Sequence, residues 1–471
     1  MSSAVRPTRV ARRLDQFGLE TVWQEFSPLA VAVGAVNLGQ GFPDWPSPAF
    51  VKAAHCATQE RDANQYCRSA GLPVLVQALA KKYTRLLGRA VDWETEVTVG
   101  VGATETLFAT MQALVDPGDE VVLISPSFDI YAAQVAMAGG VAKYVPLRLV
   151  EPASGGEAAW KLDMTELRAA FTPRTRAIIL NSPQNPTGKV FTRAELDDIA
   201  AILGDFPSVV AVSDEVYEHL VYDGVEFTRI ATLPGMADRT ITISSSGKTF
   251  SCTGWKIGWA VGPAHLIKGI VLTNQWVQYS VSTPSQLAVA TMLEAAEEPY
   301  EGAPNYYSWL LGEYTRKRDI LVSGLRAAGL RPVRPEGGFF VIANTVNFDV
   351  PEKYMALKTK AAPVMRRDWA FCRYLTEDIK VAAIPPSAFF EGARPLRAPC
   401  TPSHGVADPS TPHPPPAPCS HTDKDKEIAR DIARFAFCKQ DESLREACAR
   451  LLALRPLARD AALLPPLTPG N

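Results

Sequence analysis

The sequence predicts an α/β fold in which helices cover both faces of a mostly parallel sheet, with a second, smaller α/β domain beside it. From about residue 96, apolar β-rich runs alternate with helical stretches. Strands separated by helices imply right-handed crossovers and a mostly parallel sheet. The chain has 471 residues and is 47% hydrophobic, so it exceeds one ordinary core of roughly 100–200 residues and can fill two or three.

The predicted elements of the large sheet follow one another along the chain. The first strand, Val97–Val101, leads into a helix from Thr104, and the second, Glu120–Ile124, leads into a helix over Asp129–Ala138. Such short apolar runs are typical of strands buried on both faces. Because ligands bind beyond the carboxyl ends of these strands, we expect a site there. The remaining predicted elements are the strands Arg176–Leu180, Val209–Ser213 and Thr240–Ser244 and an amphipathic helix over Tyr307–Ala328.

The composition narrows the classes of function. A net charge of −2 provides no broad basic field, so we expect a small-molecule partner, with no nucleic acid and no membrane. No apolar run approaches the roughly 20 residues of a membrane span. The eight cysteines show no close pairing and no zinc pattern with histidine, which favours reduced thiols in an intracellular protein without a metal site.

The most informative segment is Ser244–Gly258, in which Lys248 stands in a Ser/Gly turn directly after a strand and Lys256 follows eight residues later. Packing at a strand end requires no ammonium group. A desolvated lysine in a cation-rich pocket has a lowered pKa and attacks aldehydes, which suits a Schiff-base lysine. The pattern S-x-x-K-x-F-x-x-x-G-x-[KR]-x-G resembles the pyridoxal-phosphate lysine motif of the class I/II aminotransferases, and most of all the kynurenine aminotransferase/cysteine-conjugate β-lyase group.

The resemblance spans roughly residues 11–390 and 428–455 and implies a fold-type I pyridoxal-phosphate-dependent transferase with a seven-stranded-type sheet. It predicts a large domain over residues 51–317 and a small domain formed by residues 1–50, 318–390 and 425–471. Residues 391–424 are expected to be a disordered insertion, because nine prolines between Pro395 and Pro418 neither form a helix nor bury a core. Whether the insertion is genuine or a translated intron stays open.

The N-terminal sequence is compatible with two cellular locations. Arg6, Arg9, Arg12 and Arg13 without an acid weakly resemble a mitochondrial transit peptide. The stretch from Ala11 to Asp15 also looks like the mature start of the kynurenine aminotransferase group. We therefore expect a cytoplasmic protein, with the mitochondrion as the alternative.

By resemblance, two residues are expected to contact the pyridine ring of pyridoxal phosphate and its phenolic oxygen. Asp214 follows a four-residue apolar strand, and an ionised carboxylate there keeps the ring nitrogen protonated, which strengthens the ring as an electron sink. A helix-capping aspartate is the alternative for Asp214 alone. Tyr217 completes the family's D-x-x-Y motif and is expected to hydrogen-bond the phenolic oxygen of the cofactor.

A second motif, N-x-P-x-N-P-T-G, begins at Asn181 after the strand Ala177–Leu180. Taken alone, these residues indicate only a turn between a strand and a helix. By resemblance, Asn185 contacts both the phenolic oxygen and the substrate, and Asn181 borders the cofactor and the substrate carboxylate.

The cofactor phosphate requires backbone donors at a helix start together with hydroxyl and cationic partners. Gly102, Ala103 and Thr104 open a helix and match the family's phosphate turn. Ser245 and Lys256 complete this predicted phosphate cup. The resemblance also places Phe128 against the pyridine ring and Tyr66 at the phosphate of a neighbouring subunit, which implies a homodimer.

The α-carboxylate of an amino acid requires a bidentate partner, which arginine supplies. Arg434 stands inside an alternating apolar strand pattern, where a guanidinium is costly unless it meets an anion. It matches the R-F-x-F arginine of the family, and Trp23 and Gly41 are expected to line the same pocket.

The expected reaction is amino-group transfer from an amino acid of the kynurenine, glutamine, methionine or aromatic type to a 2-oxo acid, with Lys248 as acid and base. Between Val281 and Gln286, this chain lacks the Phe-His pair of the kynurenine aminotransferases, so the preferred donor stays open. Cysteine-conjugate β-elimination at the same site is one alternative. The others are a non-catalytic regulator or scaffold of this fold and a proline-rich ligand of SH3 or WW modules.

Overall fold

The structure, a computed structural model, describes residues 10–11, 14, 17–151, 157–390, 423–460 and 464–465, without the side chains of residues 423–426. The four N-terminal arginines lie outside these residues, as does the predicted insertion up to residue 422. Within the described part of the chain, no helix is both long and apolar enough to cross a membrane. The six cysteines described there are all free.

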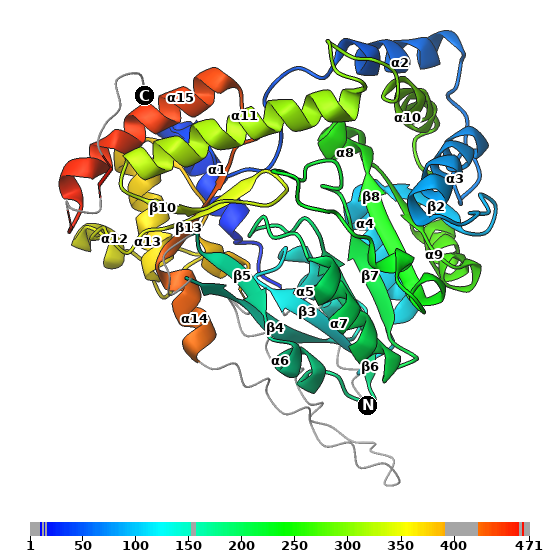
Figure 1. Cartoon of the computed structure of the whole chain (residues 1–471), viewed down its shortest axis with the longest axis horizontal. Coiled ribbons are helices and arrows are strands. Elements are labelled where there is room, and N and C mark those ends of the chain that lie inside the picture. Colours follow the sequence, from blue (N-terminus) through cyan, green and yellow to red (C-terminus); the bar gives the residue numbers. More distant parts are fainter. Residues whose placement is uncertain are drawn as a thin grey trace, which may run out of the picture.

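An eight-stranded sheet forms the centre of the molecule (Figure 1). The four ladders that join β8, β7, β6, β3 and β4 are parallel, whereas β9 runs antiparallel to both of its neighbours and β5 runs antiparallel to β4. The expected mostly parallel sheet is thereby confirmed, with one strand more than the seven-stranded type. In spatial order the strands are β2 (Val97–Val101), β9 (Ile257–Val261), β8 (Thr240–Ser245), β7 (Val210–Asp214), β6 (Thr175–Asn181), β3 (Glu120–Ser125), β4 (Val141–Val150) and β5 (Ala159–Leu162).

Helices cover both faces of this sheet because successive strand residues point to opposite sides. In β3, Val121 and Leu123 pack in one apolar cluster with α4, α5 and α9, whereas Val122 and Ile124 pack in another with α6 and α7. At the β2 edge, α2 and α3 pack on α10. These helices are α2 (Ala49–Glu60), α3 (Pro73–Leu87), α4 (Gly102–Leu114), α5 (Ile130–Met137), α6 (Met164–Ala169), α7 (Arg193–Gly204), α9 (Ala264–Val277) and α10 (Thr283–Ala295).

The long helix α11 (Tyr306–Ala327) runs from this region to a second group of elements (Figure 1). There β10 (Arg331–Val333), β11 (Phe340–Asn344) and β13 (Ile432–Ala436) form an antiparallel sheet. Residues far apart in the chain meet here, because β1 (Val36–Asn37) pairs with β12 (Val381–Ala382). The helices of this group are α1 (Val22–Ala32), α12 (Glu352–Met355), α13 (Arg367–Tyr374), α14 (Asp423–Arg430) and α15 (Asp441–Leu451).

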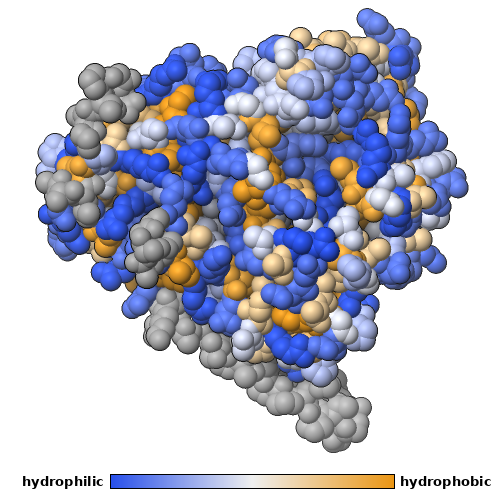
Figure 2. Space-filling model, viewed as in Figure 1, coloured by the Kyte–Doolittle hydropathy of each residue, from blue (hydrophilic) through white to orange (hydrophobic). Residues whose placement is uncertain are grey.

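Two local expectations differ from the structure. Lys248 lies on a single helical turn, α8 (Ser246–Thr249), where the sequence predicted a Ser/Gly turn without helix. Helix α14 already begins at Asp423, so its first two residues overlap the predicted insertion. The predicted division into domains is compatible with the two sheets and stays a prediction. On the face shown in Figure 2, hydrophobic patches are scattered among hydrophilic residues.

Candidate active site

The carboxyl ends of three neighbouring parallel strands meet at one edge of the large sheet. The ladder between β6 and β7 sets Asn181 opposite Asp214, and β8 ends beside them at Ser245. A cavity of about 650 Å³ lies there. It is lined by every predicted site residue except Tyr66, namely Trp23, Gly41, Gly102, Ala103, Thr104, Phe128, Asn181, Asn185, Asp214, Tyr217, Ser245, Lys248, Lys256 and Arg434.

The amine of Lys248 reaches the wall of the cavity from α8. Its Nζ donates a hydrogen bond to the carbonyl oxygen of Gly41 at 2.7 Å and lies 5.3 Å from the centre of the Phe339 ring. Burial lowers the pKa of Lys248 to about 8. About a tenth of this amine is therefore uncharged at pH 7, far more than for an ordinary lysine, and the uncharged form is the one that acts as a nucleophile.

Asp214 is a buried carboxylate at the end of β7, with 4% of its surface exposed. Burial raises its pKa to about 6, although the Tyr131 hydroxyl donates to Oδ2 at 2.6 Å and thereby opposes the rise. Within the described part of the chain, Asp214 forms no ion pair with a cationic side chain. The carboxylate thus fits a ligand that brings its own cation, such as a protonated pyridine nitrogen.

A chain of hydrogen bonds connects Asp214 to Arg434. The Asn181 amide donates to the Asp214 carbonyl oxygen at 2.9 Å, and Asn181 Oδ1 accepts from the Asn185 backbone N–H at 2.8 Å. Arg434 Nη1 then donates to Asn185 Oδ1 at 3.0 Å. These hydrogen bonds therefore fix the residues at the ends of β6 and β7 relative to Arg434 on β13.

Arg434 lies on β13 and is 1% exposed. Its Nη2 donates to the Gly39 carbonyl oxygen at 2.6 Å, and its guanidinium lies 5.4, 4.2 and 4.6 Å from the ring centres of Trp23, Phe340 and Phe389. Burial lowers the pKa of Arg434 to about 10, so the group remains charged at neutral pH. Its Nε has no hydrogen-bond partner among the described residues, which leaves the cation fit for an anionic ligand.

The predicted phosphate cup lies where α4 begins beside β9. Gly102 has a φ of +73°, and a Cβ atom built on it would lie 3.2 Å from Lys256 Nζ. A Cβ on Gly258 would lie 2.4 Å from backbone atoms of Gly102 and Ala103. Glycine at position 258 is therefore what lets β9 approach the first turn of α4, whose backbone N–H groups suit an anion.

Tyr66 lies away from the cavity and is 83% exposed. Its ring packs edge-on against Tyr279 at 5.3 Å. Trp276 and Val277, at the end of α9, are also largely exposed. Within a single chain, Tyr66 does not join the other predicted residues.

Three further residues beside the cavity, Asp129, Tyr131 and Phe389, were not predicted from the sequence. Asp129 and Tyr131 follow the predicted Phe128 by one and three residues, so their position beyond a central strand was the available signal. Asp129 accepts a hydrogen bond from Trp23 Nε1 at 3.0 Å. Phe389, which covers Arg434, is 45 residues away from it in the chain, and no sequence pattern connects the two.

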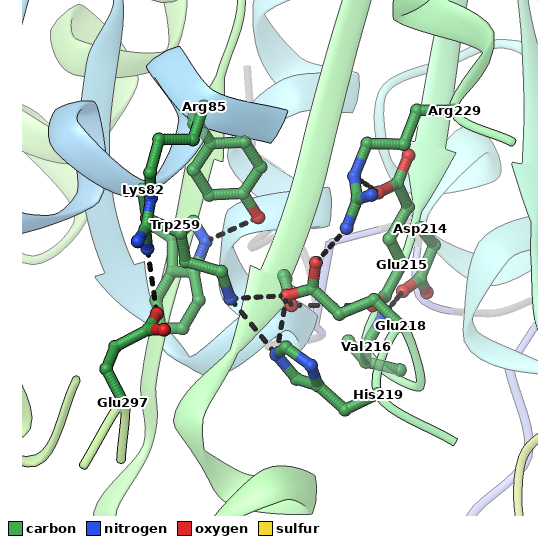
Figure 3. Close-up of polar contacts among 12 residues, drawn as sticks. Lys82, Arg85, Asp214, Glu215, Val216, Glu218, His219, Arg229, Trp259 and Glu297 are labelled. Atoms are coloured by element: carbon green, nitrogen blue, oxygen red, sulfur yellow. Dashed lines mark hydrogen bonds and ion pairs between the residues drawn. The ribbon is translucent and has the colours of Figure 1, made fainter. Parts of the chain in front are cut away.

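A buried polar cluster lies at the β7 strand end (Figure 3), and its charged members Lys82, Glu215, Glu218 and Arg229 are not among the residues that line the cavity. Glu218 pairs with Lys82 at 2.8 Å and with Arg229, whose Nε lies 3.0 Å from Glu215 in an ion pair without a hydrogen bond. Lys82 also contacts His219 Nε2 at 3.2 Å. Burial lowers the pKa of His219 to about 3, so this ring is neutral. Lys82 and Arg229 are therefore the cations of the cluster, and burial raises the pKa of Glu215 to about 7, so its carboxyl group is only partly ionised at neutral pH.

Comparison with known proteins connects this geometry to a family. The family model described as "Aminotransferase class I and II" matches residues 33–404. A kynurenine–oxoglutarate transaminase from Dictyostelium discoideum is 42% identical over 455 residues, which cover 94% of this chain and 96% of the relative.

Two solved structures extend the comparison. The N-succinyldiaminopimelate aminotransferase of Mycobacterium tuberculosis has a TM-score of 0.76 and 38% identity, with 95% of this chain and 100% of that chain covered. A protein from Escherichia coli with a methionine aminotransferase function has a TM-score of 0.77 and 32% identity, again with 95% and 100% covered.

Proposed function

The chain belongs to the class I and II aminotransferase family, and on that premise we propose that its cavity binds pyridoxal 5'-phosphate and moves the amino group of a neutral amino acid to a 2-oxo acid. One observation carries this proposal. The amine of Lys248, the carboxylate of Asp214, which lacks a cationic partner among the described residues, and the guanidinium of Arg434 all line the same cavity.

The residues of the cavity fit the proposed cofactor. Asp214 would hold the ring nitrogen, and Asn185 and Tyr217 would hold the phenolic oxygen. Ser245 and Lys256, together with the first turn of α4, would hold the phosphate. Phe128 would lie against the ring. When bound, pyridoxal phosphate supplies an electron sink that acidifies the Cα–H bond of an amino acid.

The chain's own residues supply orientation and proton transfer. Arg434 binds the α-carboxylate, and Trp23 and Gly41 enclose it, which fixes the direction of the Cα–H bond. Lys248 Nζ, with its pKa lowered to about 8, would accept the proton from Cα as a general base and then donate it to the carbon of the cofactor as a general acid. Phe340 and Phe389 keep water from the guanidinium and strengthen its pairing.

We propose kynurenine, glutamine, methionine and aromatic amino acids as the candidate donors. The names of the Dictyostelium and Escherichia coli proteins support kynurenine and methionine respectively. The apolar and aromatic side chains in the cavity, among them Leu107, Phe42 and Ile130, favour side chains without charge.

We propose a homodimer in which Tyr66 of each chain completes the phosphate cup of the other. The exposed rings of Tyr66, Trp276 and Tyr279 support this arrangement, because large apolar groups gathered on a surface mark an interaction site. The cavity of a single chain lacks this tyrosine.

The test is a panel of amino acids and 2-oxo acids offered to the purified full-length protein with pyridoxal phosphate. Both the new 2-oxo acid and the pair of ammonia and pyruvate are measured. Formation of a 2-oxo acid that matches the donor supports the proposal. Ammonia and pyruvate alone, from cysteine conjugates, would show β-elimination instead.

A further inference from the structure

Tyr131 is a tyrosine in the cavity wall with no role in the proposed chemistry. It is 2% exposed, and its hydroxyl donates a hydrogen bond of 2.6 Å to Oδ2 of Asp214. Burial, followed by the charge of Asp214, raises the pKa of Tyr131 far above its usual range, so the hydroxyl keeps its proton. Tyr131 therefore remains a donor to the carboxylate that is proposed to hold the ring nitrogen.

Within the described part of the chain, Tyr131 is the only side chain that donates to the Asp214 carboxylate. The backbone N–H of Val216 lies at a longer 3.3 Å from Oδ1. Burial raises the pKa of Asp214, and the largest effect that opposes this rise is the hydrogen bond from Tyr131, ahead of Val216 and the charge of Lys248. Hydrogen bonds to an ionised group are stronger than those between neutral groups. The charged form of Asp214 thus depends on Tyr131 more than on any other group of the described chain.

Helix α5 fixes this hydroxyl relative to other parts of the site. Phe128, Tyr131 and Gln134 are spaced three residues apart, which sets them along one side of the helical turns. The rings of Phe128 and Tyr131 pack edge to face with their centres 5.9 Å apart. Gln134 Nε2 donates to the carbonyl oxygen of Thr104 at 2.8 Å, in the predicted phosphate turn. One side of α5 therefore contacts three separate parts of the proposed cofactor site.

We propose that Tyr131 is a positioning residue that acts through Asp214: it holds the carboxylate in place and keeps a shared proton on the ring nitrogen of the cofactor. When a carboxylate and a pyridine nitrogen share one proton, its location depends on the proton affinities of both partners. A donor on Oδ2 lowers the proton affinity of the carboxylate, which favours the protonated ring and therefore the stronger electron sink. The inference rests on the proposed function.

The experiment determines which partner holds the proton. The full-length protein is loaded with pyridoxal phosphate labelled with ¹⁵N at the ring nitrogen, and the ¹⁵N chemical shift is measured at neutral pH. The wild-type protein should show the shift of a protonated pyridine. In Tyr131→Phe, the ratio of protonated to unprotonated nitrogen should fall about tenfold, which corresponds to about 1.4 kcal/mol, so the resonance should move toward that of the unprotonated ring. The kcat value should fall while KM for the amino donor changes little, because Tyr131 contacts Asp214 rather than Arg434.

Two further variants separate this role from a structural one. Tyr222→Phe removes a similarly buried hydroxyl, which donates to the Gly338 carbonyl oxygen and does not line the cavity, so the ¹⁵N shift should stay unchanged. In Asp214→Asn the ring nitrogen should be unprotonated. Adding Tyr131→Phe to Asp214→Asn should cause no further change, because Tyr131 acts through the carboxylate.

A second measurement uses the cofactor-free full-length protein, labelled with ¹³C at the aspartate side-chain carboxyl groups. The Asp214→Asn variant identifies the resonance of Asp214. Loss of the Tyr131 donor disfavours the charged carboxylate, so the titration midpoint of Asp214 should rise by about one pH unit in Tyr131→Phe.

Each outcome decides the inference. An unchanged Asp214 midpoint in Tyr131→Phe would show that Tyr131 does not act on the carboxylate. An unchanged ¹⁵N shift would show that its effect does not reach the ring nitrogen, and either result overturns the inference. If the wild-type protein does not bind pyridoxal phosphate, the proposed function fails, whereas the ¹³C titration still decides whether Tyr131 acts on Asp214.

Discussion

Burial shifts the pKa values of two candidate catalytic residues in opposite directions. The pKa of Lys248 falls to about 8, and that of Asp214 rises to about 6. In each case desolvation disfavours the charged form. Both groups are therefore closer to neutrality than their reference values imply, and a cationic ring nitrogen beside Asp214 would restore the ionised carboxylate.

The shift at Lys248 predicts a pH-dependent reactivity. In cofactor-free protein, the free amine predominates only above pH 8, so amine acylation of Lys248 should be half-maximal near pH 8, well below surface lysines of pKa about 10.4. Peptide mapping by mass spectrometry measures this. The exposed lysines of the same digest serve as the internal control, and a Lys248 profile that matches theirs would contradict the shift.

A second prediction concerns the carboxylate clamp. In Arg434→Lys the charge persists, but the planar pair of donors is lost. We expect kcat/KM for neutral amino acids to fall roughly ten- to hundredfold, because one charge-assisted hydrogen bond is worth about 1.5–3 kcal/mol. Cofactor absorbance should be normal. Wild-type efficiency would show that Arg434 has a structural role.

At the scale of the elements, the polar cluster at the end of β7 holds the turn that carries the site residues. Asp214 and Tyr217 line the cavity, whereas Glu215 and Glu218 do not, and both pair with Arg229. Glu218 also ties the turn to α3 through Lys82. The cluster thus fixes the turn through residues that do not line the cavity.

Helix α3 offers a matched comparison for this cluster, because Lys82 and Arg85 both form ion pairs at 2.8 Å (Figure 3). The pair of Lys82 with Glu218 is buried, whereas that of Arg85 with Glu297 is exposed. Lys82→Met should lower the free energy of unfolding by about 3 kcal/mol, since it leaves Glu218 undercompensated. Arg85→Met should change it by about 0.5 kcal/mol or less.

Urea denaturation followed by circular dichroism measures both variants. If Lys82→Met and Arg85→Met lose similar amounts of unfolding free energy, burial of the ion pair does not determine its contribution to stability. If Lys82→Met lowers the free energy of unfolding and also weakens cofactor retention, the cluster supports the turn that carries Asp214 and Tyr217.

Several elements were predictable from the sequence because their signals are local. Val97–Val101 matches β2, and four other predicted strands end within one residue of those observed. The direction of β9 was not predictable, since it depends on pairing with both β2 and β8. The same holds for the contact between Asp129 and Trp23, which joins residues 106 positions apart.

At the scale of the whole molecule, two variants can test the proposed dimer. One prevents assembly, and the other removes a single contact at the site. Trp276→Glu places a charge in the exposed aromatic patch and should give a monomer in analytical ultracentrifugation, with weaker retention of cofactor. Tyr66→Phe should remain dimeric and lose only the phosphate contact. A wild-type monomer saturated with cofactor would exclude the proposed arrangement.

An early and a late segment of the chain meet at the cavity, because the Ala436 N–H donates to the Leu38 carbonyl oxygen and Arg434 Nη2 donates to the Gly39 carbonyl oxygen. Most residues proposed to hold the cofactor lie between positions 102 and 256, whereas Trp23 and Gly41 come early in the chain and Arg434 comes late. Synthesis proceeds from the N-terminus, and domains fold as units. The nascent chain would therefore contain most of the cofactor-binding residues before the substrate pocket is complete. The last part of the site to be synthesised is therefore Arg434, the proposed partner of the substrate α-carboxylate.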